Sequence, residues 1–569
     1  MTNNPRIFLW VAVALMAWLN YDAWNHDYGS HDVITHTVRP GNPAPSPDLS
    51  AQIPAAPQSA TGTGGARAPD SHTAAAAQPD ESTTAAPASN TTPVAQPVHV
   101  HTDVLDIDIN TVGGTIQRAD LLNYPKVKGE AAPVRLEDVE DPQSLYVLQS
   151  GLTGPGATPS HIAQLSSAQH SYQLDGGSEL RVPLTWSGAD GVQVTKTFIF
   201  RRGQYRIGIE YTVANHSGAA WTAAPYAQIV RNDPRTKRSM FNVESYAFHG
   251  PAMWDGSKYR KLDPADKDES HLSLDVSNGW IAALQHHFVS AIVPPAGPPW
   301  RFTLTTDNDQ YRLAATGPAQ SVAPGATASF LVTAFIGPKL QSQLEASGPQ
   351  LERVADYGRL TPLAKPLFWL LDKVHGITGN WGVAIIFVTF LLKLLFYPFS
   401  EASGRSMAKM KQLQPRIKNL QELHKDDAEK RGRAMMELYQ REKINPVAGC
   451  LPIVIQIPVF LAFYWVLLES VEMRQAPFAF WIHDLSSRDP WFVLPAIMAV
   501  AMFAQYKLNP APPDPVQAKV FMFMPLVMSF MFAFFPAGLV LYWVTNTVLS
   551  IAQQWNINRR IAAAAVRRA

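Results

Sequence analysis

The sequence predicts a polytopic α-helical membrane protein with six transmembrane helices and a large β-sandwich domain. Three observations support this fold class: six apolar segments, a long stretch of alternating β-type periodicity between the first two of them, and Lys and Arg residues concentrated on one side of the apolar segments. The chain has 569 residues and a formal net charge of +1, with its charges segregated along the chain. Its single cysteine, Cys450, excludes an internal disulfide.

The first apolar segment, residues 7–19, has two interpretations. Its short core is typical of a cleaved signal peptide. Its exit, with Trp18, Tyr21 and Trp24, has no small-x-small cleavage site and suits a membrane interface. We expect residues 1–24 to form an uncleaved anchor with a cytoplasmic amino end. Residues 25–97, rich in Ala, Pro, Ser, Thr and Gly, have too few large apolar side chains for a core and are expected to be a disordered linker.

Residues 98–345 have the pattern of a β domain. Residues 105–110 alternate strictly between apolar and polar types. Residues 197–200 and 205–211 flank a turn containing Gly203, which is typical of a hairpin. A last strand is expected at 330–336, ended by Gly337 and Pro338. Many short strands with frequent Gly and Pro predict a β-sandwich.

Aromatic residues in this domain allow a sugar-binding site, but core packing explains them better. Neither a clustered acid pair nor a set of histidines with metal-ligand spacing accompanies the four tryptophans, Trp221, Trp254, Trp280 and Trp300. The adjacent His286 and His287 would point to opposite faces of a strand. His99 and His101 would share a face, with no third ligand nearby in sequence. We therefore expect no metal site and no cofactor.

The remaining chain predicts an interfacial helix followed by a membrane core. Residues 350–376 mix apolar side chains with Arg353, Arg359, Lys365 and Lys373, too many charges for a span, and predict an amphipathic helix lying in the interface. A five-helix core is expected at 377–557, with spans at residues 377–399, 449–468, 491–508, 520–535 and 538–557.

Charge predicts the topology. Lys and Arg crowd the loop at 400–444 and the tail at 558–569, so both are expected in the cytoplasm with the N-terminus, and the β domain in the periplasm. The loop has apolar positions at three- and four-residue spacing, including Met410 and Leu413, which predicts a helical hairpin. Its basic residues, such as Lys409 and Lys411, suit anionic lipid, ribosomal RNA or acidic protein segments. A solvated hairpin that only sets the topology explains the composition equally well.

Lys393 lies inside the second apolar segment. A lysine there costs about 2.5–3.5 kcal/mol on insertion scales, so it usually faces a polar interior and has a function. Thr389 and Ser400 lie on the same face of a continuous helix and extend the polar stripe. Snorkelling to the headgroups is the alternative.

Later spans add polar and Met-rich positions. Gln456, Tyr542, Trp543 and Asn546 are candidates for lining a polar cavity with Lys393, although intramembrane Gln and Asn also join helices. A Met- and Phe-rich run at 521–532 suits a surface that contacts varied apolar helices, or is ordinary lipid-facing filler. We expect this apolar slide to include Met524, Met528, Met531 and Phe460.

Several motifs together resemble the YidC family of membrane protein insertases, in its long Gram-negative form. They cover most of the chain after about residue 375 and are highly specific: Ser-Met-Ala-Lys-Met at 406–410, Glu-Lys-Ile-Asn-Pro at 442–446, Gly-Cys-Leu-Pro at 449–452, Gln-Ile-Pro at 456–458, Arg-Gln-Ala-Pro-Phe at 474–478, Trp-Ile-His-Asp-Leu at 481–485 and Phe-Pro-Ala-Gly-Leu-Val-Leu-Tyr-Trp at 535–543. The β domain resembles the family's periplasmic β-supersandwich more loosely.

The resemblance implies a protein that is not an enzyme. It implies an inner-membrane insertase and chaperone that inserts, folds and helps assemble membrane proteins, alone or with the Sec translocon, without cofactor. A hydrophilic groove would hold the family's single positive residue, usually arginine, at Lys393, with Thr389 as a second groove position. The implied partners are nascent membrane proteins, the SecYEG translocon, the ribosome, the signal recognition particle machinery and lipid, and not DNA.

The residues also allow two other classes of protein. A small-molecule transporter also uses intramembrane charge, but it normally shows internal repeats and broken helices, and no convincing repeat is present. A membrane-anchored glycan-binding protein or enzyme would need sugar-recognising or paired acidic residues in the β domain.

Overall fold

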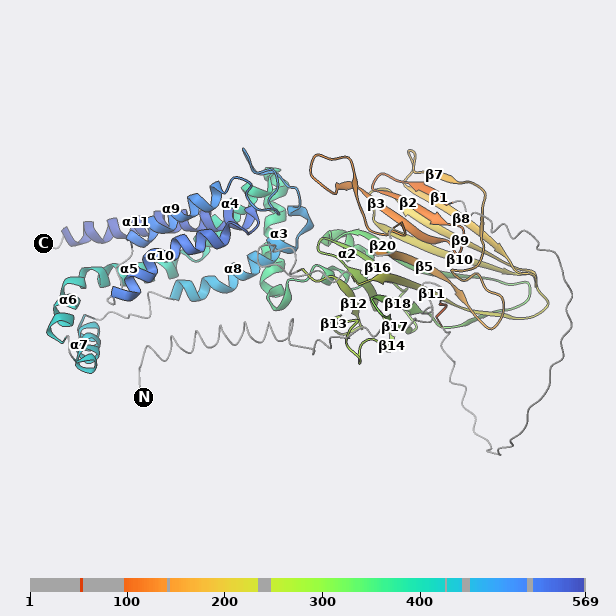
Figure 1. Ribbon diagram of the computed structural model, residues 1–569, viewed down its shortest axis with the longest axis horizontal. Coiled ribbons are helices and arrows are strands. Elements are labelled where there is room, and N and C mark those ends of the chain that lie inside the picture. Colours follow the sequence, from red (N-terminus) through yellow and green to blue (C-terminus); the bar gives the residue numbers. More distant parts are fainter. Residues whose placement is uncertain are drawn as a thin grey trace, which may run out of the picture.

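The computed structural model describes residues 52–54, 97–140, 144–233, 247–424, 427–442, 451–508 and 515–566. The expected anchor at 1–24 lies outside these residues, as does nearly all of the expected linker. The described chain has a β-sandwich followed by helices, and the two parts lie end to end (Figure 1).

Two sheets form the sandwich. The first has 11 strands, in the order β14-β17-β18-β11-β5-β3-β2-β1-β7, with β19 on β11 and β4 on β3; the second has nine, in the order β13-β12-β15-β16-β20-β10-β9-β8-β6. Pairing is antiparallel except between β1 and β7. The strands are β1 Val98–His101, β2 Leu105–Asn110, β3 Thr115–Pro125, β4 Pro133–Arg135, β5 Tyr146–Thr153, β6 Ser166–Ser167, β7 Ser171–Gln173, β8 Glu179–Ser187, β9 Val192–Arg201, β10 Arg206–Asn215, β11 Trp221–Asn232, β12 Gly250–Trp254, β13 Tyr259–Lys261, β14 Ser273–Val276, β15 Trp280–Leu284, β16 Phe288–Val293, β17 Trp300–Asp307, β18 Gln310–Thr316, β19 Gln320–Val322 and β20 Thr327–Pro338.

Alternation along the strands explains the packing. In β9 and β10 every second residue is buried, as expected for strands with one face on the core and one in solvent. The hairpin expected around Gly203 joins these two strands. The four tryptophans are buried in the core of the sandwich, which confirms their interpretation as packing residues.

Lys196 is fully buried and joins the two sheets. From β9 its ammonium group donates to the carbonyl oxygens of Gly113 at 2.8 Å, Gly114 at 3.0 Å and Ser150 at 2.9 Å, all in or beside strands of the other sheet. Burial lowers the pKa of Lys196 well below its ordinary value. These bonds give three buried carbonyl groups a charged donor from the opposite sheet.

Glu137 is also fully buried, between β4 and β5, and it predicts a pH dependence. Its carboxyl group accepts from the Ser290 hydroxyl at 2.5 Å, and burial raises its pKa to about 7. As the pH rises from 4.5 to 7, the unfolded chain releases this proton and the folded chain retains it, so the group's stabilisation is lost across that window. We expect wild type to lose about 3 kcal/mol relative to Glu137→Gln over that range, by chemical unfolding. The exposed Glu130→Gln is the control, and equal pH profiles for wild type and Glu137→Gln would disprove the assignment.

After the sandwich the chain is helical. The helices are α2 Gln341–Ser347, α3 Thr361–Thr378, α4 Trp381–Leu395, α5 Tyr397–Gln412, α6 Gln414–Leu423, α7 Ala428–Arg441, α8 Leu451–Glu469, α9 Val493–Leu508, α10 Pro515–Phe532 and α11 Ala537–Val566, with short 3-10 turns at Leu351–Val354, Gly358–Leu360 and Val471–Met473. Helix α3 lies across the ends of the other helices, next to the sandwich (Figure 1).

Two predicted boundaries were wrong. The interfacial helix expected at 350–376 begins at Thr361, after two 3-10 turns, and ends at Thr378, where the left-handed conformation of Gly379 terminates α3. The span expected at 377–399 is two helices, α4 and α5, bent by 64°. Pro398 lacks the amide hydrogen that would continue the helix, which explains the break before it.

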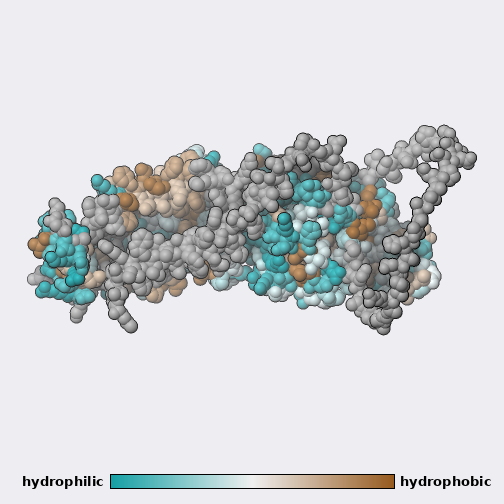
Figure 2. All heavy atoms as spheres, turned by 60° about the horizontal axis from the view of Figure 1, so that its bottom comes forward, coloured by the Kyte–Doolittle hydropathy of each residue, from teal (hydrophilic) through white to brown (hydrophobic). Residues whose placement is uncertain are grey.

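By length and composition, no single helix among the described residues is long and apolar enough to cross a membrane. The bent pair formed by α4 and the start of α5 is long and apolar enough when the two helices are taken together. Helices α8, α9 and α10 contain shorter apolar helices. Hydrophobic residues gather over this helical part, next to a more hydrophilic end (Figure 2).

That end is the pair α6 and α7, which pack through Leu413, Ile417 and Tyr439. Lys409 is exposed and Met410 is half-buried, whereas the side chain of Lys411 lies outside the described residues. Asp427 caps α7 by accepting from the amides of Glu429 and Lys430.

The sandwich contacts the segment after α8. Arg474 donates to the carbonyl oxygen of Pro125 at 2.8 Å and lies 5.5 Å from the ring centroid of Phe288. The sequence predicted that His286 and His287 lie on opposite faces of a strand, and this prediction was wrong. They lie in the turn between β15 and β16 with their rings stacked, and His286 bonds the carbonyl oxygen of Leu468. Burial lowers the pKa of His286 to about 3, so this residue is neutral at the junction.

Candidate substrate groove

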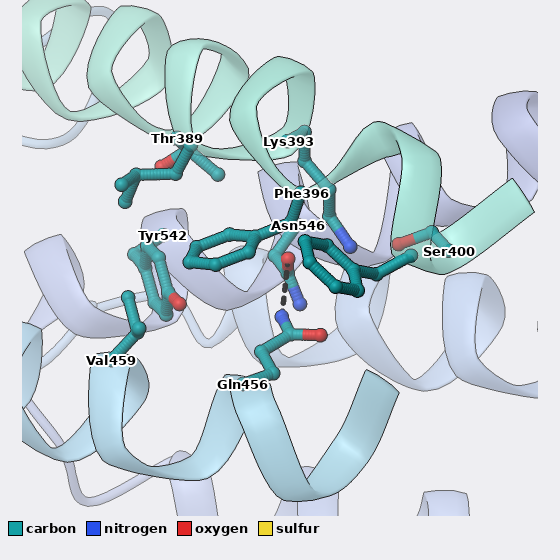
Figure 3. Close-up of a pocket in the computed structure, with 10 residues that line it drawn as sticks. Thr389, Lys393, Phe396, Ser400, Gln456, Val459, Tyr542 and Asn546 are labelled. Atoms are coloured by element: carbon teal, nitrogen blue, oxygen red, sulfur yellow. Dashed lines mark hydrogen bonds between the residues drawn. The ribbon is translucent and has the colours of Figure 1, made fainter. Parts of the chain in front are cut away.

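Four helices, α4, α5, α8 and α11, surround a small cavity of about 40 Å³ at the α4–α5 bend, lined by both polar and apolar side chains. A water needs about 10–15 Å³, so the cavity has room for two or three. Figure 3 shows its side chains converging from these helices. They are Thr389, Leu392, Lys393, Phe396, Phe399, Ser400, Gln456, Val459, Tyr542 and Asn546.

Lys393 is half-buried and is held by neutral groups. Its ammonium group donates to the Ser550 hydroxyl at 2.8 Å. Ser550 in turn donates to the Asn546 backbone carbonyl at 2.7 Å, so its oxygen lone pairs are directed to the lysine. Lys393 is the only charged side chain among the lining residues that the structure describes. Its charge therefore has no carboxylate partner within the cavity lining.

The other predicted groove residues have separate roles. Gln456 donates to the side-chain carbonyl of Asn546 at 2.6 Å and thereby connects α8 to α11. The Thr389 hydroxyl donates to the carbonyl of Ile385, one turn back in its own helix, at 2.6 Å. Ser400 also lines the cavity, although the bend invalidates the continuous helix on which its placement was predicted.

An aromatic cluster forms the wall behind the cavity. Tyr542 is 3% exposed and stacks on Phe463, with ring centroids 4.5 Å apart. Trp543 lies outside the cavity lining, in edge contact with Phe460 at 4.6 Å and 5.1 Å from Phe532. These contacts fix α11 against α8 and α10, so the pair Tyr542 and Trp543 has one residue facing the cavity and one supporting it.

Ser550 and two apolar residues at the cavity, Phe396 and Phe399, were not predicted from the sequence. Ser550 lies four residues after Asn546 and eight after Tyr542, which is one face of a helix, so spacing alone would have found it. Phe396 and Phe399 were not predictable in this way, because the bend brings them to the cavity.

Two of the four residues of the predicted apolar slide are exposed. Met524 is 39% and Met531 is 44% exposed on α10, and Leu526 and Phe530 beside them are exposed further. Met528 and Phe460 are half-buried against the helical core. Exposed apolar side chains gathered on one helix suit a lipid or protein partner.

Comparison with known proteins identifies the family. Residues 97–370 match the family model described as the YidC periplasmic domain, and residues 373–564 match the model described as 60Kd inner membrane protein. The membrane protein insertase YidC of Thioalkalivibrio sulfidiphilus is 46% identical, covering 99% of both chains, and that of Nitrosococcus oceani is 43% identical, covering 98% of this chain and 99% of its own.

Among solved structures, an active YidC insertase with its first transmembrane domain resolved is 18% identical, with a TM-score of 0.37, covering 80% of this chain and 92% of its own. The two family models together span residues 97–370 and 373–564, and the relatives match over nearly the full length of the chain. The chain belongs to the YidC family of membrane protein insertases, which are not enzymes, and is an inner-membrane protein with a periplasmic β-sandwich domain and a helical membrane region.

Proposed function

We propose that the protein inserts nascent membrane proteins by attracting the segment that must cross into the groove at Lys393. The observation that supports this most strongly is the pairing of Lys393 with neutral Ser550 only, in a lining that has no carboxylate among the described residues. A hydroxyl satisfies one donor of an ammonium group without neutralising its charge. The charge is therefore available to an acidic polar segment of a substrate.

The position of the groove strengthens this attraction. Two unit charges 4 Å apart interact by about 1 kcal/mol in water and about 4 kcal/mol at the effective dielectric constant of 20 that suits protein sites. Waters in the cavity would keep the polar segment partly solvated. Lysine supplies the same charge as the arginine usual in the family but not its planar fork, so the proposal depends on charge rather than on bidentate hydrogen bonding.

The apolar part of a substrate would leave through the side of the helical region. Helix α10 offers Met524, Met528 and Met531, and Phe460 lies next to the groove wall on α8. Methionine adapts to apolar partners of varied shape because it is unbranched and polarizable. Burial of the substrate helix in lipid drives the step, without covalent chemistry or a cofactor.

We further propose that both termini and the α6–α7 hairpin lie in the cytoplasm, because of the basic residues there. The exposed Lys409 and the hairpin surface would receive substrate from the ribosome and the signal recognition particle machinery. The SecYEG translocon would cooperate on larger substrates, for which the protein also acts as a chaperone of folding and assembly.

Reconstitution tests this function directly. Liposomes containing only the purified protein are expected to insert a single-span substrate with an acidic translocated tail, measured by protection of the tail from added protease. Liposomes without protein provide the background. Protection no greater than this background would contradict autonomous insertion.

A further inference from the structure

A cluster on the outer face of the periplasmic domain has the arrangement of a metal site. We propose that His99, His101, Asp106 and Asp108 bind one zinc ion. One ligand atom from each of His99, His101 and Asp106 lies within 4.8 Å of those of the other two. The sequence analysis expected no third ligand for the two histidines. That expectation was wrong, because pairing of the first two strands brings the carboxylates opposite them.

Strand register builds the cluster. His99 is paired with Asp108 and His101 with Asp106 across β1 and β2. The alternate residues of the two strands, such as Val98 and Val100, are buried in the core, so all four polar side chains share the outer face. Directly opposite residues of a strand pair have Cβ atoms about 4.5–5.5 Å apart, close enough for side chains to converge on one ion.

The ligand atoms already face one another. His99 Nδ1 lies 2.9 Å from Asp108 Oδ1, and His101 Nδ1 lies 3.1 Å from Asp106 Oδ2. His99 Nδ1 is also 3.6 Å from Asp106 Oδ1. A zinc ion with nitrogen and oxygen ligands at about 2.0–2.2 Å would take the place of the protons in these contacts after small side-chain shifts.

Arg118 of β3 orients the carboxylates from behind. Its guanidinium group donates to Asp106 Oδ1 at 2.9 Å and to Asp108 Oδ2 at 2.6 Å. These bonds leave Asp106 Oδ2 and Asp108 Oδ1, the oxygens nearest the histidines, for the metal. Hydrogen bonds that fix the unused oxygen of a ligating carboxylate are typical of built metal sites.

Charge and access agree with a divalent cation. The guanidinium group of Arg118 lies 3.4 Å from His99 Nδ1 and would repel a cation bound at that nitrogen. The carboxylates outnumber the guanidinium groups, however, since Arg118 and Arg135 contact Asp106, Asp108, Asp120, Asp138 and Glu140. The two histidine side chains are 41% and 42% exposed, so an ion can enter from solvent.

Two imidazole nitrogens and two carboxylate oxygens favour zinc over calcium or magnesium, which prefer oxygen alone. The ion would tie β1 to β2 where the chain enters the sandwich. This inference does not depend on the proposed groove mechanism, because no residue is shared between the two sites.

Calorimetric titration of the full-length, untagged protein in detergent with zinc tests the proposal. Wild type is expected to bind one zinc ion, and His99→Ala, His101→Ala and Asp106→Asn each to bind at least about tenfold more weakly. His216→Ala, which removes an exposed histidine elsewhere in the domain, should match wild type. No binding by wild type, or equal affinity in the ligand variants, would overturn the site.

Two further readouts exclude a folding artefact and nonspecific binding. Zinc should raise the unfolding temperature of wild type and leave that of Asp106→Asn unchanged, each compared with its own zinc-free value. Cobalt in place of zinc should give the strong visible absorption of four-coordinate geometry. A weak octahedral spectrum in wild type would contradict the assigned ligands.

Discussion

Replacing Lys393 by Met is expected to lower the rate of insertion of an acidic-tailed substrate at least about tenfold, because a tenfold change needs only about 1.4 kcal/mol of the groove's attraction. Methionine keeps an unbranched side chain of similar volume and removes the charge. Lys393→Arg should retain most of the activity, and Lys393→Glu should abolish it, since a carboxylate repels the tail. Rates are measured in the reconstituted liposomes by protease protection.

The matched control is Lys373→Met, which removes an exposed lysine from α3 outside the cavity and should leave insertion unchanged. Ser550→Ala separates positioning from charge: it removes the hydroxyl that holds the ammonium group and should lower the rate less than Lys393→Met. Insertion by Lys393→Met at the wild-type rate would remove this residue from the mechanism.

Substitution of Lys196 by Met is expected to have the largest effect on stability. Methionine fills much of the same volume but leaves the carbonyl oxygens of Gly113, Gly114 and Ser150 without this donor between the sheets. Each buried carbonyl left unpaired costs about 1–3 kcal/mol, so a total loss of about 3 kcal/mol or more is expected. Denaturant unfolding followed by tryptophan fluorescence measures it, because the four tryptophans of the core report on the sandwich.

Lys258→Met, at an exposed position of the same domain, provides the comparison and should leave the unfolding midpoint unchanged. If Lys196→Met unfolded at the same denaturant concentration as Lys258→Met, the buried ammonium group would not be holding the sheets together. Zinc is omitted from both experiments, so that the site on β1 and β2 does not contribute.

Local patterns predicted the sandwich well and the membrane helices less precisely. Strict alternation at 105–110 was recognisable because β2 has one buried face, and β2 spans those residues. The predicted span at 377–399 failed at its ends, because hydropathy records apolar length and not helix continuity. The break at Phe396 depends on Pro398 and on a backbone hydrogen bond that ends α4, and neither changes the hydropathy.

Contacts between distant segments were predictable only as candidates. The sequence nominated Lys393, Gln456, Tyr542 and Asn546 by their polarity within apolar helices, and the structure brings all four around one cavity. The sequence also nominated Trp543, the residue after Tyr542 in the same helix. Which of two consecutive helical residues faces the cavity depends on which helices pack beside them, and this is not known from the sequence. The carboxylate partners of His99 and His101 were missed for a related reason, since strand register is a tertiary property.

If charge at position 393 selects the segment that enters the groove, exchanging the charges of residue 393 and of the substrate tail should reverse the selection. Substrates with acidic, neutral and basic tails of equal length are inserted by wild type and by Lys393→Glu in the same liposomes, without a membrane potential. The proposed mechanism predicts that wild type prefers the acidic tail and that Lys393→Glu reverses the order in favour of the basic tail. The same tail preference in both proteins would contradict it.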